Sequence, residues 1–367
     1  MDELKPPQRL LLGPGPCNAP YRVLRAMSTP LLGHLDPLFM EVMDDTCALL
    51  RDTFQTTNQM TFPVSGTGSA GMEACFVNLL EPGDKAVVGI NGVFGTRMAD
   101  VAARCGAEVI KVEADWGTPL DQGQIIDTLK QHPEAKLCAI VYAETSTGIL
   151  QPIQEIGAYL KDKDTLLLVD AVTALGGVEL KVDDWGIDAC YSGTQKCLAV
   201  PPGLAPVTFG DKALEVLAGR QTKVQSWYLD LTMLQKYWGS ERLYHHTAPI
   251  SMIYGLREGL RIVAEEGLDN RVARHAAAAG HLAQGLSDMG FSFWATEGYR
   301  LPPLTCVYPP QGWDVEGIRK QLLTDYDIEL GGGLGPVAGK IWRIGLMGEN
   351  ACVQKVAVLL RALKDFA

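Results

Sequence analysis

Short apolar segments alternate with helix-like segments between residues 60 and 170, and this alternation constrains the fold more than any other feature of the sequence. Strand-like segments are expected at residues 60–64, 86–90, 108–112, 137–142 and 165–170, and helical segments at 72–80, 95–105, 122–130 and 153–160. Alternation at this spacing predicts a largely parallel sheet with helices on both faces. In sheets of this kind, ligands bind at the carboxyl ends of the strands.

The predicted strands end in residues that can bind a ligand. A Ser-Gly-Thr-Gly turn at residues 65–68 links the first strand to a helix. This arrangement is typical of a phosphate site, because glycines let the backbone approach and the helix N-terminus offers free N–H groups. Later strand ends supply residues 91–94, residues 144–146, Asp170 and Lys196. We therefore expect one buried site that gathers these strand ends.

Lys196 follows a strand-like segment at 187–191 and a turn of small residues, and it precedes the apolar segment 197–200. Lysine is rarely buried without a partner or a chemical role. Burial lowers the proton affinity of an amine and makes it a nucleophile, as a Schiff-base lysine requires. A surface lysine at a strand end is the alternative, but the buried-type strand that ends in Asp170 favours a site.

The glycine-rich turn is compatible with two cofactors. Gly66, Gly68 and Gly71 match the dinucleotide fingerprint, but the next strand ends in Asn91 instead of the acidic residue that would hold a ribose. A nicotinamide-dependent dehydrogenase is therefore the second hypothesis. A third is a catalytically silent oligomeric protein that keeps the fold.

Pyridoxal 5'-phosphate explains the set of strand-end residues better. This cofactor needs an amine for the Schiff base, a carboxylate at the ring nitrogen, a phosphate site and a group that stacks on its ring. Lys196, Asp170, the turn at residues 65–69 and Phe94 would supply these in turn. The combination favours pyridoxal phosphate over a nicotinamide.

The composition excludes several other classes of protein. A formal net charge of −11 argues against a nucleic-acid partner, whose binding surface would be basic. The nine cysteines have neither CxxC pairs nor zinc spacing, so we expect reduced thiols, a cytoplasmic location and no metal. The first nine residues are polar and proline-bearing, and no apolar segment reaches membrane-spanning length, so neither a signal peptide nor a membrane partner is expected.

The chain divides into three predicted parts. Residues 1–20 are proline-rich and read as an extended N-terminal arm, residues 21–267 as a large cofactor-binding domain, and residues 268–367 as a smaller C-terminal α+β domain. A long helix at about 251–266 ends at Gly267, which marks the boundary between the two domains.

Nearly from end to end, the sequence resembles the class V, fold-type I pyridoxal-phosphate aminotransferases, specifically the alanine/serine–glyoxylate aminotransferase family. The resemblance implies an α/β fold with a large domain, whose mostly parallel sheet is flanked by helices, and a smaller C-terminal α+β domain. The segments that carry it are residues 11–16 (LLGPGP), 65–68 (SGTG), 81–84 (EPGD), 146–148 (STG), 168–170 (LVD), 191–196 (YSGTQK), 244–247 (YHHT) and 331–335 (GGGLG).

The resemblance also implies residue roles. Lys196 would form the Schiff base and move the proton between substrate and cofactor, and Asp170 would pair with the ring nitrogen. Phe94 would stack on the ring, and Ser146 would hydrogen-bond the ring hydroxyl or the surroundings of Asp170. Arg343 would bind the substrate carboxylate, a task suited to a guanidinium.

A second subunit is implied as well, because members of this family complete their sites across a homodimer. The phosphate would be held by Ser65, Gly66, Thr67, Gly68 and Gln195, with Tyr244 and Thr247 of the second subunit. Gly33 and the proline-rich arm would close the substrate pocket.

The implied reaction moves an amino group from L-alanine or L-serine to glyoxylate by a ping-pong mechanism. Gln195 precedes the lysine where cysteine desulfurases have histidine, which favours transamination, and Tyr244 favours this donor pair over ureidoglycine. 3-Hydroxykynurenine and ureidoglycine remain alternative donors. Phe94 and Ser69 stand where some relatives have Trp and His, which affects the expected affinity for the cofactor and not the reaction class.

Overall fold

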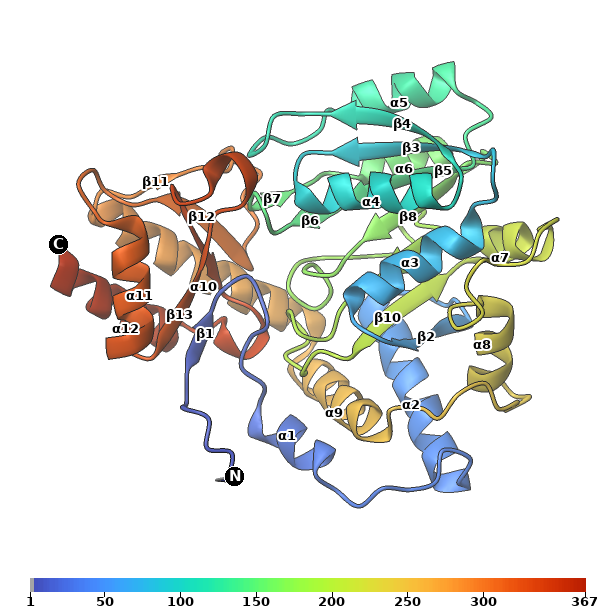
Figure 1. Cartoon of the computed structure of the whole chain (residues 1–367), viewed down its shortest axis with the longest axis horizontal. Helices are drawn as coiled ribbons and strands as arrows, with labels where there is room; N and C mark the ends of the chain where they lie inside the picture. Colours follow the sequence, from blue (N-terminus) through green and yellow to red (C-terminus); the bar gives the residue numbers. More distant parts are fainter. Residues whose placement is uncertain (1–2) are drawn as a thin grey trace.

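The computed structural model describes residues 3–367, and within them the larger sheet has seven strands in the order β2-β10-β9-β8-β5-β3-β4 (Figure 1). β10 is antiparallel to both of its neighbours, whereas the other neighbouring strands are parallel. The largely parallel sheet predicted from the sequence is therefore confirmed. Its strands are β2 (Met60–Ser65), β3 (Lys85–Ile90), β4 (Glu108–Glu113), β5 (Leu137–Val141), β8 (Leu166–Asp170), β9 (Ala189–Tyr191) and β10 (Leu204–Phe209).

Helices cover this sheet and make its central strands the core of the domain. β5 and β8 are buried along their whole length, as continuous apolar strands are when both faces of a parallel sheet are covered. Several helices begin at an aspartate whose carboxylate accepts a backbone N–H, as Asp36 does from Leu38 and Asp121 from Gly123. The helices are α2 (Pro37–Phe54), α3 (Gly68–Leu79), α4 (Val93–Arg104), α5 (Gln122–Gln131), α6 (Gln154–Leu160), α7 (Asp211–Ala218), α8 (Leu231–Trp238) and α9 (Ile250–Glu266).

A second sheet forms the core of the C-terminal part and has the order β1-β13-β14-β12-β11. α10 begins at Leu268, the first residue of the predicted second domain, and packs with the other helices of this part around a separate apolar core. The elements are β1 (Leu10–Leu12), α10 (Leu268–Asp288), β11 (Ser292–Phe293), β12 (Leu304–Tyr308), α11 (Val315–Asp325), β13 (Ile328–Gly332), β14 (Trp342–Gly345) and α12 (Val353–Leu363).

Part of the N-terminal arm forms an edge strand of the C-terminal sheet. Leu10–Leu12 pairs in parallel with Ile328–Leu330, and Leu12 is fully buried in the second core. The prolines at 14 and 16 made the segment read as extended, but the leucines before them supply an apolar edge strand. Both ends of the chain therefore build the smaller domain.

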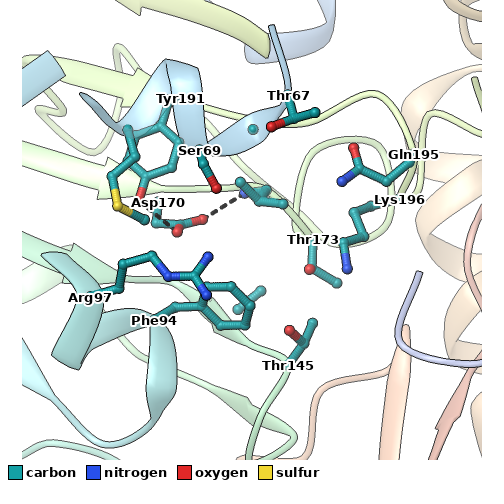
Figure 2. A pocket seen from close by; sticks show the side chains of 14 residues that line it. Thr67, Ser69, Phe94, Arg97, Thr145, Asp170, Thr173, Tyr191, Gln195 and Lys196 are labelled. Carbon is teal, nitrogen blue, oxygen red and sulfur yellow. Dashed lines mark hydrogen bonds between the residues drawn. The ribbon is translucent and has the colours of Figure 1, made fainter. Parts of the chain in front are cut away.

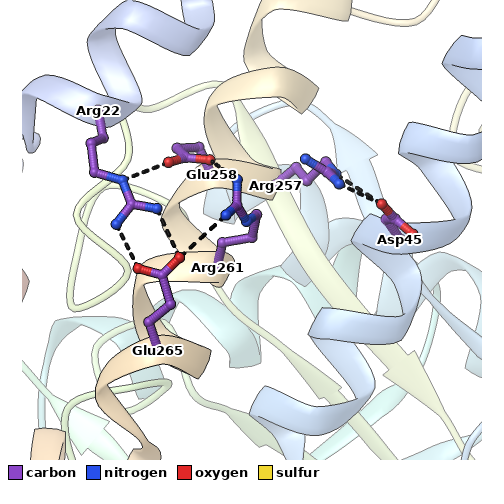
Figure 3. Close-up of polar contacts among 6 residues, drawn as sticks. All are labelled: Arg22, Asp45, Arg257, Glu258, Arg261 and Glu265. Carbon is purple, nitrogen blue, oxygen red and sulfur yellow. Dashed lines mark hydrogen bonds and ion pairs between the residues drawn. The ribbon is translucent and has the colours of Figure 1, made fainter.

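Ion pairs hold the segment after β1 against the larger domain (Figure 3). Arg22 of α1 (Tyr21–Met27) contacts Glu258 at 2.7 Å and Glu265 at 2.5 Å, both on α9. Arg257 of α9 in turn contacts Asp45 of α2 at 2.5 Å. With β1 on one side and α1 on the other, residues 13–20 are anchored at both ends.

The remaining elements are short and join the two parts. α9 and α10 meet at Gly267, whose φ of 79° suits glycine. Within residues 3–367, no helix is both long and apolar enough to cross a membrane, and no cluster of side chains could hold a metal ion. The short elements are β6 (Ala143–Glu144), β7 (Ile149–Leu150) and the 3-10 helices η1 (Gly335–Val337), η2 (Gly348–Asn350) and η3 (Lys364–Phe366).

Candidate active site

The carboxyl ends of the parallel strands surround a cavity of about 140 Å³ (Figure 2). This location agrees with the expectation from the strand ends in the sequence. The cavity brings together six predicted site residues with several that were not predicted. It is lined by Thr67, Gly68, Ser69, Met72, Phe94, Arg97, Ala143, Thr145, Asp170, Val172, Thr173, Tyr191, Gln195 and Lys196.

Asp170 ends β8 and presents a carboxylate that is only 3% exposed. Its Oδ2 accepts a 2.6 Å hydrogen bond from the Tyr191 hydroxyl, and its Oδ1 accepts one of 2.8 Å from the Val172 N–H. Burial raises the pKa of Asp170 to about 6, while the two hydrogen bonds act in the opposite direction. The carboxylate is therefore ionised at neutral pH in an apolar setting, which suits it to pair with a cationic ring nitrogen.

Lys196 lies across the cavity from Asp170 (Figure 2), and its side chain is 8% exposed. Burial lowers the pKa of its amine to about 8, so far more of it is the neutral nucleophile at physiological pH than for an ordinary lysine. Nζ donates a hydrogen bond to the carbonyl oxygen of Pro14, from the anchored segment of the arm. The N-terminal arm thus reaches the reactive amine of its own chain.

Arg271 of α10 holds the backbone beside Lys196 through hydrogen bonds. The guanidinium is buried and donates to the Cys197 carbonyl at 2.7 Å and to the Gly176 carbonyl at 3.0 Å. It also pairs with Glu266 at 2.6 Å. This arginine connects the lysine loop to the junction between α9 and α10, and the sequence pattern alone did not single it out.

The glycine-rich turn and the start of α3 form one end of the cavity. Thr67 is the N-cap of α3 but makes no side-chain cap hydrogen bond, so the first N–H groups of the helix are free for a ligand. Thr67 and Ser69 add hydroxyl groups, and the buried Oε1 of Gln195 has no hydrogen-bond partner within residues 3–367. Free backbone N–H groups and hydroxyl groups together suit a phosphate.

Ser65 and Gly66 do not line the cavity, although they belong to the predicted phosphate site. Ser65 Oγ lies 2.7 Å from Nε2 of His246, and His246 Nδ1 lies 2.9 Å from Nδ1 of His245. Burial lowers the pKa of His246 to about 4, so the ring is neutral. The two histidines are therefore linked by hydrogen bonds to each other and to Ser65 at the turn.

Phe94 and Arg97 lie on the first two turns of α4 and face the cavity together (Figure 2). The guanidinium carbon of Arg97 is 5.1 Å from the centre of the Phe94 ring. The ring lines the cavity, and its stacking role stays a prediction. Arg97 belongs to no recognisable motif. Only its position three residues after Phe94, on the same helix face, could have predicted that it lies at the site.

Ser146 is outside the cavity, and its neighbour Thr145 lines it instead. Ser146 Oγ donates to Glu144 at 2.5 Å and accepts from the Val93 N–H at 2.9 Å. The two residues lie in the turn that follows β6, where Thr145 faces the cavity and Ser146 faces Glu144.

Arg343 projects from β14 and is 8% exposed. Its Nε donates to the Gly332 carbonyl at 2.7 Å and its Nη1 to the Thr145 carbonyl at 3.3 Å, so it adjoins the cavity through Thr145. Tyr244, Thr247 and Gly33 are exposed and do not line the cavity of their own chain. Tyr244, which is 60% exposed, has its ring centre 5.2 Å from that of His34.

A family model described as "Aminotransferase class-V" matches residues 13–333 of the chain. The (S)-ureidoglycine–glyoxylate transaminase of Bacillus subtilis (strain 168) is 41% identical over 99% of this chain and 91% of that protein. The alanine–glyoxylate aminotransferase of Drosophila melanogaster is 40% identical over 98% of this chain and 92% of that protein. The crystal structure of an alanine–glyoxylate aminotransferase from Nostoc sp. has a TM-score of 0.97 and 47% identity, covering 100% of this chain and 97% of that one. The chain belongs to the class-V aminotransferases.

Pyridoxal phosphate is the cofactor of this family, and the residues of the cavity fit it. A buried lysine with a lowered pKa faces a buried carboxylate, and an aromatic ring lies between helix α4 and the cavity. At the other end of the cavity, the start of α3 has no side-chain cap, so its first N–H groups can bind the phosphate. The nicotinamide alternative finds no such support, because the strand after the glycine-rich turn ends in Asn91 and Gly92.

Proposed function

We propose that this enzyme transfers the amino group of L-alanine or L-serine to glyoxylate, giving glycine and pyruvate or hydroxypyruvate. The observation that carries the proposal is the pairing of Lys196 and Asp170 across one cavity, with a lowered amine pKa and a hydrogen-bonded carboxylate. The alanine–glyoxylate aminotransferases among the relatives, at about 40% identity over nearly the whole chain, support the substrate assignment.

The residues divide the chemistry among them. Bound pyridoxal phosphate supplies an aldehyde that takes up the amino group and a ring that withdraws electrons from the substrate carbon. Asp170 holds a proton at the ring nitrogen, and Lys196 Nζ removes and returns the proton at the substrate carbon. The start of α3 binds the phosphate with Thr67, Gly68 and the other groups of that end of the cavity.

Arg343 would bind the carboxylate that alanine, serine and glyoxylate share. Two of its nitrogens are held by backbone carbonyls, so the guanidinium is already oriented before substrate arrives. Ureidoglycine is the second candidate donor, because the Bacillus transaminase is as similar to this chain as the alanine–glyoxylate enzymes are. Alanine and serine differ by a single hydroxyl, so the proposal includes both as amino donors.

A homodimer completes the proposal. Large apolar side chains are exposed on two segments of the large domain, residues 21–38 and residues 227–244. Exposed apolar patches of this kind mark protein interfaces. We expect a second copy to cover them and to place Tyr244, Thr247 and Gly33 against the cavity of its partner. The exposed residues are Tyr21, Leu24, Leu31, Leu35, Leu38, Trp227, Tyr228, Leu243 and Tyr244.

The thiol chemistry supports a reducing compartment such as the cytoplasm. All nine cysteines are free within residues 3–367, and most are buried. Burial raises the pKa of Cys17, Cys47, Cys138, Cys197 and Cys306 to about 12, so these thiols are protonated and unreactive.

An absorbance spectrum of the purified protein tests the function directly. A visible band of the bound cofactor should give way to a shorter-wavelength band with L-alanine and return with glyoxylate, and Lys196→Ala should abolish turnover. L-Serine, ureidoglycine and 3-hydroxykynurenine can be ranked in the same cuvette. No visible band after addition of pyridoxal phosphate would reject the roles of Lys196 and Asp170, and a band that no amino donor changes would reject the transamination.

A further inference from the structure

A second carboxylate is buried beside the cavity and is not used by the reaction described above. Glu144 ends the short strand β6 and is fully buried. One of its oxygens, Oε1, accepts hydrogen bonds from Ser146 N at 2.9 Å and from Ser146 Oγ at 2.5 Å. The other, Oε2, accepts from Phe94 N at 3.0 Å and from Gly95 N at 3.4 Å. A carboxylate so deeply buried, with four donors on it, has a specific task.

The task is suggested by where the donors lie. Phe94 and Gly95 belong to the first turn of α4, whose N-cap residue, Gly92, has no side chain to cap it. Glu144 therefore supplies the missing cap from another strand end, and its negative charge lies at the positive end of the helix dipole. Burial raises the pKa of the Glu144 carboxyl, and the four hydrogen bonds act against that shift in favour of the ionised form.

The packing leaves this contact little freedom. A Cβ on Gly92 would lie 2.4 Å from the Glu144 carboxyl carbon and 2.5 Å from Ser146 Oγ, so the absence of a side chain there lets the carboxylate lie against the backbone. Ser146 Oγ, which donates to Glu144, also accepts from Val93 N. The first three N–H groups of α4 thus all end on the pair formed by Glu144 and Ser146.

We propose that Glu144 is a positioning residue for the cofactor: it fixes the start of α4, and so holds the Phe94 ring where the pyridine ring stacks. The inference rests on the proposed cofactor use, and deepens it. Arg97 follows on the same helix and Thr145 follows Glu144 in the chain, so both walls of the cavity are tied to this carboxylate. Ser146, which does not face the cavity, would act through its bonds to Glu144 and to Val93 N.

The equilibrium dissociation constant of pyridoxal phosphate from the cofactor-free chain is the measurement that tests the inference. It can be read from the quenching of tryptophan fluorescence and from the circular dichroism induced in the bound cofactor. Glu144→Gln keeps the shape of the side chain but turns an amide donor toward the Ser146 N–H, so the constant should rise by about 10-fold or more. Glu113→Gln, at an exposed position on β4, is the matched control and should change it by less than about twofold.

A double-mutant cycle separates positioning from a general loss of stability. If Glu144 acts through the ring, Glu144→Gln should weaken binding by less than about threefold in a Phe94→Leu background, where the stacking ring is already gone. A full 10-fold effect in both backgrounds, or no effect in the wild type, would overturn the inference. If Glu144→Gln does not fold, Ser146→Ala gives the same cycle, because it removes one donor to Glu144 and the acceptor of Val93 N.

A failure of the positioning role of Glu144 can be distinguished from a failure of the proposed transamination. A wild-type chain that binds pyridoxal phosphate without transaminating alanine would reject the function and leave the role of Glu144 in place. Unchanged affinity in Glu144→Gln, in a wild-type chain that transaminates, would reject the positioning role alone. A wild-type chain that binds no pyridoxal phosphate would reject both.

Discussion

The hydroxyl of Tyr191 donates a 2.6 Å hydrogen bond to the carboxylate of Asp170, and the two residues are register partners on the neighbouring strands β8 and β9. Burial and the adjacent carboxylate raise the pKa of Tyr191, so its hydroxyl stays a donor at any pH at which the enzyme works. The bond favours the ionised form of Asp170 and so acts against the effect of burial on its pKa.

Tyr191→Phe should move the acid limb of the kcat/KM profile to higher pH. The hydrogen bond lowers the pKa of Asp170 against the effect of burial, so its loss should raise that pKa further above its present value of about 6, by about one unit. Tyr142→Phe is the control, because that buried hydroxyl donates to the Glu179 carbonyl. A pH profile that is the same for all three proteins would contradict the role of Tyr191.

Gly15→Ala should strongly impair attachment of the cofactor. An added Cβ would lie 2.6 Å from Lys196 Nζ, and the φ of 102° at this position disfavours any side chain. Gly13→Ala is a matched control in the same segment, since its Cβ would have 3.7 Å to the nearest atoms. The visible absorbance per subunit after addition of pyridoxal phosphate reports the difference. Equal absorbance in the two variants would show that the arm does not restrict the lysine.

Arg343→Lys should lower kcat/KM for alanine and for glyoxylate by about 10-fold or more, mostly through KM. Lysine keeps the positive charge but loses the planar pair of donors that binds a carboxylate at two points. It also leaves the Gly332 carbonyl without the 2.7 Å bond that orients the side chain. Arg319→Lys, on the surface of α11, should have no effect. A loss confined to one of the two substrates would contradict a shared carboxylate site.

Arg271→Ala should destabilise the protein by about 3 kcal/mol, because it leaves two buried carbonyls without their donor and breaks the pair with Glu266. The exposed Arg104, which pairs with Asp100 at 2.8 Å, provides the control: Arg104→Ala should cost less than about 1 kcal/mol. Urea unfolding of the two variants with cofactor bound measures both. Equal midpoints would show that the lysine loop does not depend on Arg271.

A mixture of Lys196→Ala and Tyr244→Ala subunits tests the proposed dimer. If Tyr244 completes the cavity of the partner, each hybrid dimer has one site with both residues intact, so co-expression should restore activity above that of either variant. If Tyr244 serves its own chain, each hybrid site lacks one of the two residues. Activity no higher than that of Tyr244→Ala alone would then follow, with the subunit mixture confirmed by mass.

Residues whose role depends on position along a strand could be predicted, and those defined by three-dimensional packing could not. Asp170 ends one apolar strand and Lys196 follows another, and the carboxyl ends of parallel strands lie at the same edge of a sheet. The choice between Thr145 and Ser146 depends on which way each residue of a turn faces, and sequence spacing does not decide that. Glu144 is one of the predicted strand-end residues, but its bonds to the backbone of α4, like those of Arg271 to Cys197, leave no pattern in the sequence.

The pairing of β1 with β13 has a consequence for the order of assembly. A chain is made from its N-terminus, so Leu10–Leu12 must wait, unpaired, until Ile328–Leu330 has been synthesised. The larger domain can form in the meantime, because its sheet lies between these two strands in the chain. We therefore expect β1 to pair after the larger domain has formed, and the contact of Pro14 with the amine of Lys196 to form late in the biosynthesis of the chain.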